Sequence, residues 1–560
     1  MSDMPEPRPA AALRPAGQVM TLERLGSLHQ SRLSFMRVLL RRLFRDGWHF
    51  ERTVWDIDAD GVGHAVYSAK GARTYSLVVF AHDLPDELRS DRVIAEAWDA
   101  TFSLFDGVPT SEDIERLRAN VPKQEAGRVS ERELTLSRAN RSVRLWGHVV
   151  DALAAGRQPD PAQIASVGYL MRTTAVYGSG KFGAADREVI ADRPELNPPF
   201  QAELLSVYLI RWFVRDLVEH MATSQGGTSA VRLAPEIARS LGIGNSTGLG
   251  MAPFLVNHPQ LFNNWIMARE TAFARVRALP SATEDEAALF RDLFARSCAS
   301  VDLWASDHPL QVEKLAALRP DLDRAAAYLA EADLVSGHPW SRLWQWAEAE
   351  LCIDAQELLI SLMLEPYGSL VDDLVFEMAD NSGTARIDGA MSLNRLQDIL
   401  RRGYAWALET NWAERQAQAR AWYVSAEKLE PRLGERFDEP IEDYEQPLAP
   451  GRDAAALYRA LEGWNGAPTV AAFAMAHPEH RSAIRRAQIF HNAPYAEIQG
   501  NTIDAALMPI DMLRAKLSFF GAIHFDPRSD RWVRICMYSG APYPDELASN
   551  DPEFSIYPPR

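Results

Sequence analysis

Residues 49–84 read HFERTVWDIDADGVGHAVYSAKGARTYSLVVFAHDL, and they mark where the chain changes from a helical to an extended pattern. β-Branched and aromatic residues form three short runs, which DADG and AKGA separate. Short links rich in Asp and Gly between such runs are typical of hairpin turns. The alternation of Thr53, Trp55 and Ile57 indicates that helices cover one face of the strands. The stretch therefore predicts a three-stranded antiparallel meander at about 49–83.

The segment before the meander, residues 21–48, has apolar residues at mostly helical spacing and several arginines in its second half. A basic amphipathic helix of this kind either lies on a membrane surface or packs on a core with its arginines solvated. Glu23 and Asp46 flank the segment and the whole chain is acidic, which favours the core-packed helix. Residues 1–20 contain acids and prolines and are expected to form a disordered lead.

From about residue 85 to 425 the pattern is overwhelmingly helical. Helix-start signals recur, such as Thr110 before an acidic first turn and Asp160 before a proline. Pro235 opens a helix that Gly242 can end as a C-cap. The longer expected helices cover about 161–176, 259–279, 284–300, 309–332, 340–366 and 392–425.

The C-terminal part adds a linker and a second extended region. Residues 427–450 are acidic and interrupted by prolines, which is typical of a linker or surface loop. After two or three further helices, GAIHFDPRSDRWVRICMYSG at 521–540 predicts a hairpin around DPRSD. We expect this hairpin to join the N-terminal meander in one small antiparallel sheet.

The predicted fold class is therefore mainly α, in an α+β arrangement: a large helical body with a small antiparallel sheet from the chain ends. The expected organisation is a disordered lead at 1–20, a helix plus meander at 21–84, a helical body carrying the site at 85–426, the linker at 427–450, and helices plus hairpin at 451–560.

Composition excludes several functional classes. The formal net charge is -17, and a field of that sign repels phosphate backbones and anionic membranes, so no nucleic-acid or membrane partner is expected. The three cysteines have no paired spacing, which argues against a disulfide framework and against structural zinc. No secretory signal is expected at the N-terminus and no stretch predicts a transmembrane helix, so the expected location is the cytoplasm.

Two glycine-rich segments stand out as candidate ligand sites: RTTAVYGSGKFGAADR at 172–187 and GIGNSTGLG at 242–250. Glycine turns and helix starts expose backbone N–H groups, which would bind a carboxylate or phosphate. The alternative is that both are plain turns between helices. If they meet in space, the expected substrate-binding residues are Arg172, Ser179, Gly180, Asn245, Ser246, Thr247 and Gly248.

Neither segment matches a nucleotide-binding motif. GSGKFG lacks the four-residue spacer of a Walker A loop and the Ser or Thr after its lysine. GNSTGLG follows a segment that reads as helix, whereas a dinucleotide fold needs a strand there. No cofactor is therefore expected, and acid–base chemistry is the simplest reaction class. The expected proton-transfer residues are Tyr177, Lys181 and His258, although His258 would also suit a helix junction.

Two further clusters have competing interpretations. Arg211, Arg215 and Glu219 follow at four-residue spacing, which predicts an intramolecular ion-pair ladder rather than a carboxylate site. His477 and His480, with the later His491, hint at metal, but the proline and glutamate between the first two read more easily as a helix start, so no metal site is expected.

These features favour a cytoplasmic enzyme of bacterial type that acts on a small carboxylate- or phosphate-bearing metabolite as a cofactor-independent lyase or isomerase. The alternatives are a transferase with a nucleotide or CoA donor, and a non-catalytic protein-binding or assembly protein. The sequence leaves the substrate, the reaction and homo-oligomerisation open.

Overall fold

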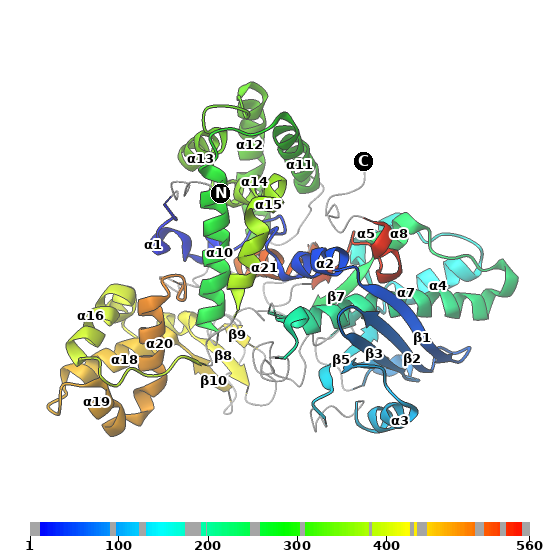
Figure 1. Ribbon diagram of the computed structural model, residues 1–560, viewed down its shortest axis with the longest axis horizontal. Helices are drawn as coiled ribbons and strands as arrows, with labels where there is room; N and C mark the ends of the chain where they lie inside the picture. Colours follow the sequence, from blue (N-terminus) through cyan, green and yellow to red (C-terminus); the bar gives the residue numbers. More distant parts are fainter. Residues whose placement is uncertain are drawn as a thin grey trace, which may run out of the picture. The chain divides into compact units, whose positions relative to one another are not determined.

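The computed structural model describes residues 12–89, 97–121, 130–173, 192–197, 199–246, 258–302, 309–379, 384–425, 431–433, 445–498, 509–522, 524–526 and 534–550. The chain forms two compact units, and each consists of segments that are far apart in the sequence. The first unit contains Met1–Leu33, Gly248–Phe519 and Pro527–Trp532; the second contains Ser34–Thr247, Phe520–Asp526 and Val533–Arg560. The fold is α+β, with a helix-rich body and a mixed, mostly antiparallel sheet (Figure 1).

All strands of the large sheet belong to the second unit, in the order β1-β2-β3-β4-β5-β6-β7-β12-β11. The strands are β1 His49–Ile57, β2 Gly63–Lys70, β3 Thr74–Ala81, β4 Ala100–Asp106, β5 Glu133–Arg141, β6 Tyr169–Thr173, β7 Gly242–Ser246, β11 His524–Asp526 and β12 Arg534–Met537. Every neighbouring pair is antiparallel except β6 and β7, which are parallel. The predicted meander and terminal hairpin are confirmed, and both belong to this sheet.

The sheet is larger than the sequence pattern indicated, because β4 to β7 lie between the meander and the hairpin. These four strands occupy a region that was expected to be helical. In β4, every residue from Ala100 to Phe105 is buried, so the strand shows no alternation of apolar and polar residues. A short apolar run of this kind cannot be told from helix by periodicity alone.

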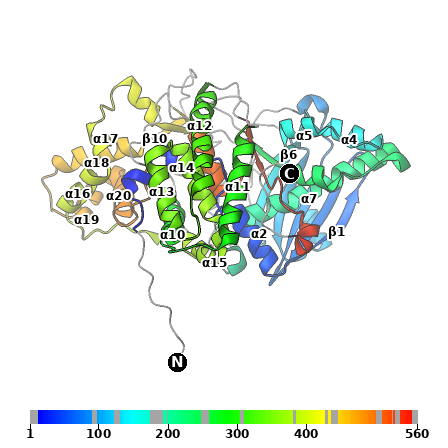
Figure 2. The same cartoon turned by 90° about the horizontal axis from the view of Figure 1, so that it is seen from above.

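Two helices, α7 and α3, cover opposite faces of the sheet (Figure 1), and Figure 2 shows α7 from above. On one face lies α7, Gln201–Gly226, whose Ser206 Oγ is 2.7 Å from Thr135 Oγ1 of β5. Phe213 of α7 packs edge-on against Phe102 of β4 at 5.8 Å between ring centroids. On the other face lies α3, Ser111–Asn120, whose Leu117 packs in an apolar cluster with strand residues.

The remaining helices of the second unit are short. They are α2 Phe35–Arg45, α4 Trp146–Ala154, α5 Pro161–Val167 and α8 Pro235–Ser240, with 3₁₀ turns η2 Asp86–Leu88, η4 Pro194–Leu196, η5 Gly227–Ser229 and η12 Pro544–Ser549. The core-packed interpretation of the arginine-rich segment holds for α2, which buries Phe35 to Leu40, but the expected solvated arginine face is only partly confirmed, since Arg37 is 5% exposed. A continuous helix over 21–48 is wrong, because η1, Leu22–Arg24, belongs to the first unit and ends well before α2.

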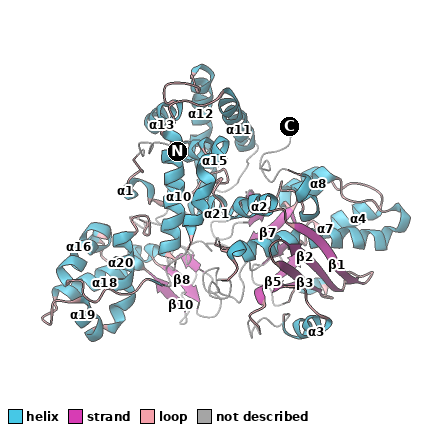
Figure 3. Cartoon of the chain, viewed as in Figure 1, coloured by secondary structure: helices cyan, strands magenta, loops and turns pink. Residues whose placement is uncertain are grey.

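The first unit contains most of the described helices and a small sheet (Figure 3). Its helices are α1 Ala16–Val19, α10 Pro259–Arg277, α11 Glu284–Asp302, α12 Pro309–Glu331, α13 Pro339–Glu350, α14 Ile353–Met363, α15 Gly368–Val371, α16 Leu393–Gly403, α17 Ala405–Glu409, α18 Pro450–Glu462, α19 Val470–Ala476, α20 Arg481–Asn492 and α21 Pro509–Phe520. Its other 3₁₀ turns are η6 Glu365–Tyr367, η7 Asp372–Met378, η9 Arg415–Arg420 and η11 Pro478–His480. Among the residues described, no helix has both the length and the apolarity that crossing a membrane requires.

Several predicted boundaries were wrong for local reasons. The expected helix 161–176 stops at Val167, because Gly168 adopts φ 78 and ends α5. The expected helix 340–366 is two helices, since Leu351 is extended between α13 and α14. The expected linker at 427–450 contains β9 Pro431–Leu433 and β10 Glu445–Leu448, which pair with β8 Trp422–Ser425.

Candidate functional site

The strands β6 and β7 form the one parallel pair of the sheet, and α7 lies between them in the chain. Arg172 of β6 pairs with Gly244 of β7, and Thr173 pairs with Asn245. The carboxyl ends of the two strands therefore lie side by side at one edge of the sheet. Each glycine-rich segment continues from one of these strand ends. In sheets with parallel strands, ligands bind outside the carboxyl ends, so this edge is the candidate site.

Residues that pair between neighbouring strands lie on the same face of a sheet. Thr173 and Asn245 pair with each other and continue the row of strand side chains that faces α7, so both lie on the α7 face. Their exposed fractions are 0% and 1%. Within the part of the chain that the structure describes, Thr173 Oγ1 is buried without a hydrogen-bond partner. A buried hydroxyl without a hydrogen bond is unfavourable, and a bound group or a water molecule can supply the missing partner.

The opposite face of the same edge carries Arg138, Asn140 and Arg172. Asn140 of β5 pairs with Arg172, and Arg138 lies two residues earlier on the same face. Arg172 is 3% exposed and Asn140 is 2% exposed. The guanidinium of Arg138 stacks over the Trp98 ring at 4.5 Å. Guanidinium groups such as those of Arg138 and Arg172 can bind a carboxylate or phosphate through paired hydrogen bonds.

The glycines of β7 have a steric role that the loop interpretation missed. A Cβ at Gly244 would lie 2.6 Å from carbons of the Tyr169 ring. A Cβ at Gly242 would lie 2.3 Å from the Met537 carbonyl oxygen. The expectation that Gly242 ends a helix is therefore wrong: α8 ends at Ser240, and Gly242 is the first residue of a tightly packed strand.

The position of β7 also corrects the interpretation of the segment GNSTGLG. GNSTGLG was judged to lack a preceding strand, yet its first residues, Gly244 to Ser246, are the end of β7. Asn245 and Ser246 are thus strand residues rather than part of a loop leading directly into a helix. The next described helix is α10, which begins at Pro259.

Arg211 of α7 holds the segment that leads into β7. Its guanidinium donates hydrogen bonds to the carbonyl oxygens of Arg239 at 3.0 Å and Leu241 at 2.8 Å, and to that of Ala541 at 2.9 Å. The same group lies 3.9 Å from the centroid of the Tyr543 ring, and the side chain is 2% exposed. Arg211 of α7 therefore holds both the residues that precede β7, Arg239 and Leu241, and the segment that contains Ala541.

The expected ion-pair ladder along this helix is wrong. Arg215 Nη2 lies 2.6 Å from Asp545 Oδ2, and Glu219 accepts a hydrogen bond from the Leu233 amide at 3.1 Å. Arg215 and Glu219 thus contact other segments of the unit rather than forming an i,i+4 ion pair with each other, although Arg215 Nη2 also lies 3.5 Å from Asp216 Oδ1 on α7.

The structure places only some of the predicted site residues. Arg172, Asn245 and Ser246 are in the neighbouring strands of the second unit, with Arg172 and Asn245 on opposite faces. His258 is half-buried in the first unit and is the N-cap residue of α10. Tyr177, Ser179, Gly180, Lys181, Thr247 and Gly248 lie outside the described residues. Sequence reasoning missed Thr173, Arg138 and Asn140. Assigning the run ELTLSRANR at 133–141 as a strand would have pointed to Arg138 and Asn140.

The cysteines and His477 are poor candidates for catalysis in their present surroundings. Burial raises the pKa of Cys298 to about 11 and the pKa values of Cys352 and Cys536 to about 12, so these thiols are neutral near pH 7. His477 lies 3.1 Å from Glu479 beside the 3₁₀ turn that precedes α20, as a helix start predicts. Among the described residues, no three His, Cys, Asp or Glu side chains come together as a metal site.

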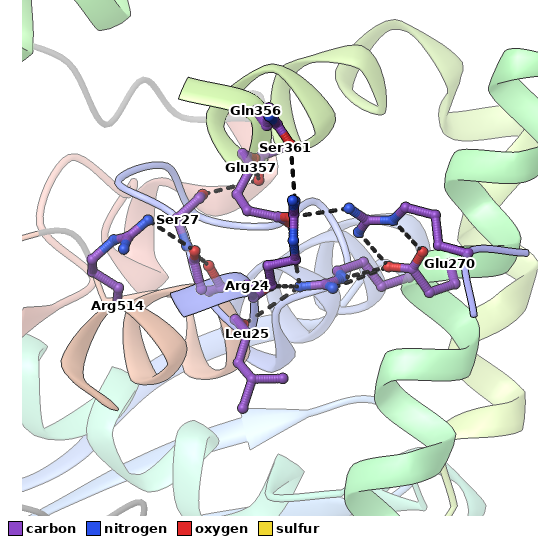
Figure 4. Close-up of polar contacts among 12 residues, drawn as sticks. Arg24, Leu25, Ser27, Glu270, Gln356, Glu357, Ser361 and Arg514 are labelled. Carbon is purple, nitrogen blue, oxygen red and sulfur yellow. Dashed lines mark hydrogen bonds and ion pairs between the residues drawn. The ribbon is translucent and has the colours of Figure 1, made fainter. Parts of the chain in front are cut away.

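A network of buried charges occupies the first unit (Figure 4). Arg14 donates to Glu270 through Nε and Nη2, both at 2.8 Å, and to Glu357 Oε1 at 3.0 Å. Arg24 donates to Glu357 at 3.1 Å, and Arg269 donates to Glu270 at 3.0 Å. Burial alone would raise the pKa of Glu270, but the ion pairs with Arg14 and Arg269 lower it overall from 4.5 to about 2.

This network predicts an acid-sensitive first unit. Because the pKa of Glu270 is lower in the folded chain, its stabilisation is complete above about pH 4.5 and is lost as the pH falls towards 2. The shift corresponds to about 3 kcal/mol of unfolding free energy. Urea unfolding should therefore show a large gap between the wild type and Glu270→Gln at neutral pH that narrows with acidification.

The exposed Glu348, which accepts a hydrogen bond from Gln18, provides the control. Glu348→Gln should leave the acid dependence of unfolding as in the wild type. A gap between wild type and Glu270→Gln that stays constant down to about pH 2 would contradict the assignment.

Comparisons with protein-family models, with curated proteins and with solved structures found no match to this chain.

Proposed function

We propose that this chain binds a small carboxylate- or phosphate-bearing metabolite at the carboxyl ends of β6 and β7. The observation that carries the proposal is the parallel pairing of Thr173 with Asn245, which brings the starts of both glycine-rich segments together. Polar side chains on both faces of this edge support it, since the buried Arg172 and the half-buried Arg138 lie on one face and the buried Thr173 hydroxyl lies on the other.

The reaction proposed for this site is acid–base chemistry, as in a cofactor-independent lyase or isomerase. The anion would be held by Arg172 together with backbone N–H groups of the glycine-rich segments. Tyr177, Lys181 and His258 are the proposed proton donors and acceptors.

A second candidate function, transfer from a nucleotide or CoA donor, is favoured by one observation. In the chain, β7 leads into the glycine-rich segment, and the next described helix is α10, which begins at Pro259; a strand, a glycine-rich segment and a helix follow in this order in phosphate-binding folds. The diphosphate of such a donor would use the same guanidinium groups, so the two candidates share a site and differ in the ligand.

The test is ligand binding by thermal shift and calorimetry, with inorganic phosphate, mono- and dicarboxylates, sugar phosphates, ATP and CoA as probes. We expect at least one small anion to raise the midpoint of unfolding. Arg172→Met should then weaken its binding by about 100-fold, because a charge-assisted hydrogen-bond pair is lost without loss of side-chain volume. If ATP or CoA binds tightest, the transferase is favoured.

Arg193→Met is the matched control. Arg193 is 7% exposed in the same unit and donates to Asp106 at 2.9 Å, so its loss should reduce stability and leave ligand affinity unchanged. Equal affinities of the two variants would refute the site.

Once a ligand is identified, Lys181→Ala or His258→Ala should abolish turnover while the fold is retained. Full activity in both variants would refute the proton-transfer assignment. A chain that no small molecule stabilises, and that co-purifies with a protein, would be a binding or assembly protein instead.

A further inference from the structure

The turn between α19 and α20 of the first unit brings two histidines together. Pro478 starts a 3₁₀ turn there, and the His480 amide donates a hydrogen bond to the His477 carbonyl at 3.2 Å. Side chains three residues apart eclipse each other in a 3₁₀ turn. The centroids of the two imidazole rings accordingly lie 6.2 Å apart. The sequence indicated a helix start here, and the same turn also pairs two side chains that can bind metal.

The neighbours of the two rings fix their position and the tautomer of one of them. Phe473 of α19 contacts both, with its centroid 4.8 Å from that of His477 and 6.0 Å from that of His480. His477 Nδ1 lies 3.1 Å from Glu479 Oε1. Because an ionised carboxylate only accepts hydrogen bonds, Nδ1 carries the proton and Nε2 keeps a lone pair for an ion. A carboxylate behind the imidazole is the usual support of a metal-bound histidine.

The separation of the two rings suits a single shared ion. A metal ion lies about 2 Å from a coordinating imidazole nitrogen. Two rings that share an ion are therefore separated by at most two such bonds and two ring radii, and 6.2 Å lies just within that limit. A separation near the limit corresponds to a wide angle between the two nitrogen–metal bonds. Copper(I), which accepts few ligands, tolerates such an angle, whereas zinc in proteins prefers a tetrahedral arrangement.

A thioether close to the two histidines favours the same ion. Met475 precedes His477 by two residues and is 78% exposed. Their Cα atoms are therefore at most about 7.6 Å apart, which a methionine side chain with three rotatable bonds can span. Thioether sulfur is a soft ligand that selects copper(I), while zinc sites in proteins use His, Cys, Asp and Glu.

We propose that Met475, His477 and His480 bind one copper(I) ion at the turn between α19 and α20. The two imidazoles supply nitrogen ligands that the turn already holds together, and the methionine swings in as the third ligand. The side chain of His477 is 37% exposed, so an ion can reach the site from solution. The site belongs to the first unit and does not depend on anion binding at the β6–β7 edge.

The test measures copper(I) binding to the full chain without oxygen, in competition with a chromogenic copper(I) chelator. The wild type should bind one equivalent more than His477→Ala or His480→Ala. The three cysteine thiols are present in all of these proteins, so the difference reports this site alone. Circular dichroism should show that the variants keep their fold. Equal copper stoichiometry in the wild type and both variants would overturn the proposal.

Two further variants test the thioether and the specificity of the site. Met475→Leu should weaken copper(I) binding by about 10-fold and leave zinc binding unchanged, because only copper(I) uses the sulfur. His491→Ala is the matched control: His491 is on α20, where its Nε2 lies 3.0 Å from Arg395 Nη2, and its loss should leave copper binding as in the wild type. Unchanged copper(I) affinity of Met475→Leu, or an equal loss in His491→Ala, would also overturn the proposal.

Discussion

Replacement of Arg211 by leucine is expected to lower the free energy of unfolding of the second unit by about 4 kcal/mol. The substitution removes the charged donor from the carbonyl oxygens of Arg239, Leu241 and Ala541; the Arg239 carbonyl keeps its hydrogen bond from the Gly540 amide, so the loss falls on Leu241 and Ala541. Each unsatisfied buried acceptor costs about 1–3 kcal/mol. Urea unfolding followed by circular dichroism measures the loss.

Arg215→Leu is the control on the same helix. Arg215 also stacks on Tyr543, at 4.3 Å, but its ion-pair partner Asp545 has 37% of its side chain exposed. Water can replace that partner, so the expected loss is about 1 kcal/mol. Equal losses in the two variants would show that the carbonyl contacts of Arg211 add nothing. Because Arg211 fixes the entry into β7, its loss should also weaken anion binding at the β6–β7 edge.

Gly26→Ala is expected to cost more than about 4 kcal/mol or to prevent folding of the first unit. A Cβ at this position would lie 2.0 Å from the backbone carbonyl carbon of Arg514 and 2.1 Å from the amide nitrogen of Ala515. Both atoms belong to the backbone of α21, so no rotamer change relieves the overlap. The N-terminal segment would have to move away from α21 and break the hydrogen bond from Arg514 to the Gly26 carbonyl.

Gly147→Ala tests whether this effect is steric. No atom lies within 4 Å of a Cβ added to Gly147, and this residue is inside α4. Its unfolding free energy should be unchanged or higher by up to about 1 kcal/mol, because alanine has the better helix propensity. Normal stability of Gly26→Ala, measured by urea unfolding beside Gly147→Ala, would contradict the close approach of the two backbones.

Much of the candidate site could not have been assigned from local sequence patterns. Arg172 was expected where a helix over about 161–176 meets a glycine-rich segment, whereas it is the fourth residue of a buried strand that is only five residues long. Asn245 was expected among exposed amide donors, whereas it is 1% exposed under the face that α7 covers. Thr173, Arg138 and Asn140 were not assigned at all. Their relation depends on pairing between strands that are distant in the chain, which no periodicity encodes.

The sequence by itself determined the elements whose signals are local. Thr110 forms the expected capping box with Asp113, and Asp160 caps α5 through the Ala162 amide. The meander turns and the terminal hairpin also followed from neighbouring residues, because turns and caps are satisfied within a few positions.

Only the tertiary structure decided the middle of the sheet and the edge that carries the proposed site. Strands buried on both faces lose the alternation that marks a strand in sequence, so β4 to β7 resembled helix. The parallel pairing of β6 with β7, the carbonyl partners of Arg211 and the burial of Thr173 all arise from contacts between remote segments. Such contacts are selected by packing and hydrogen-bond satisfaction across the whole unit, and a local stretch of sequence contains neither.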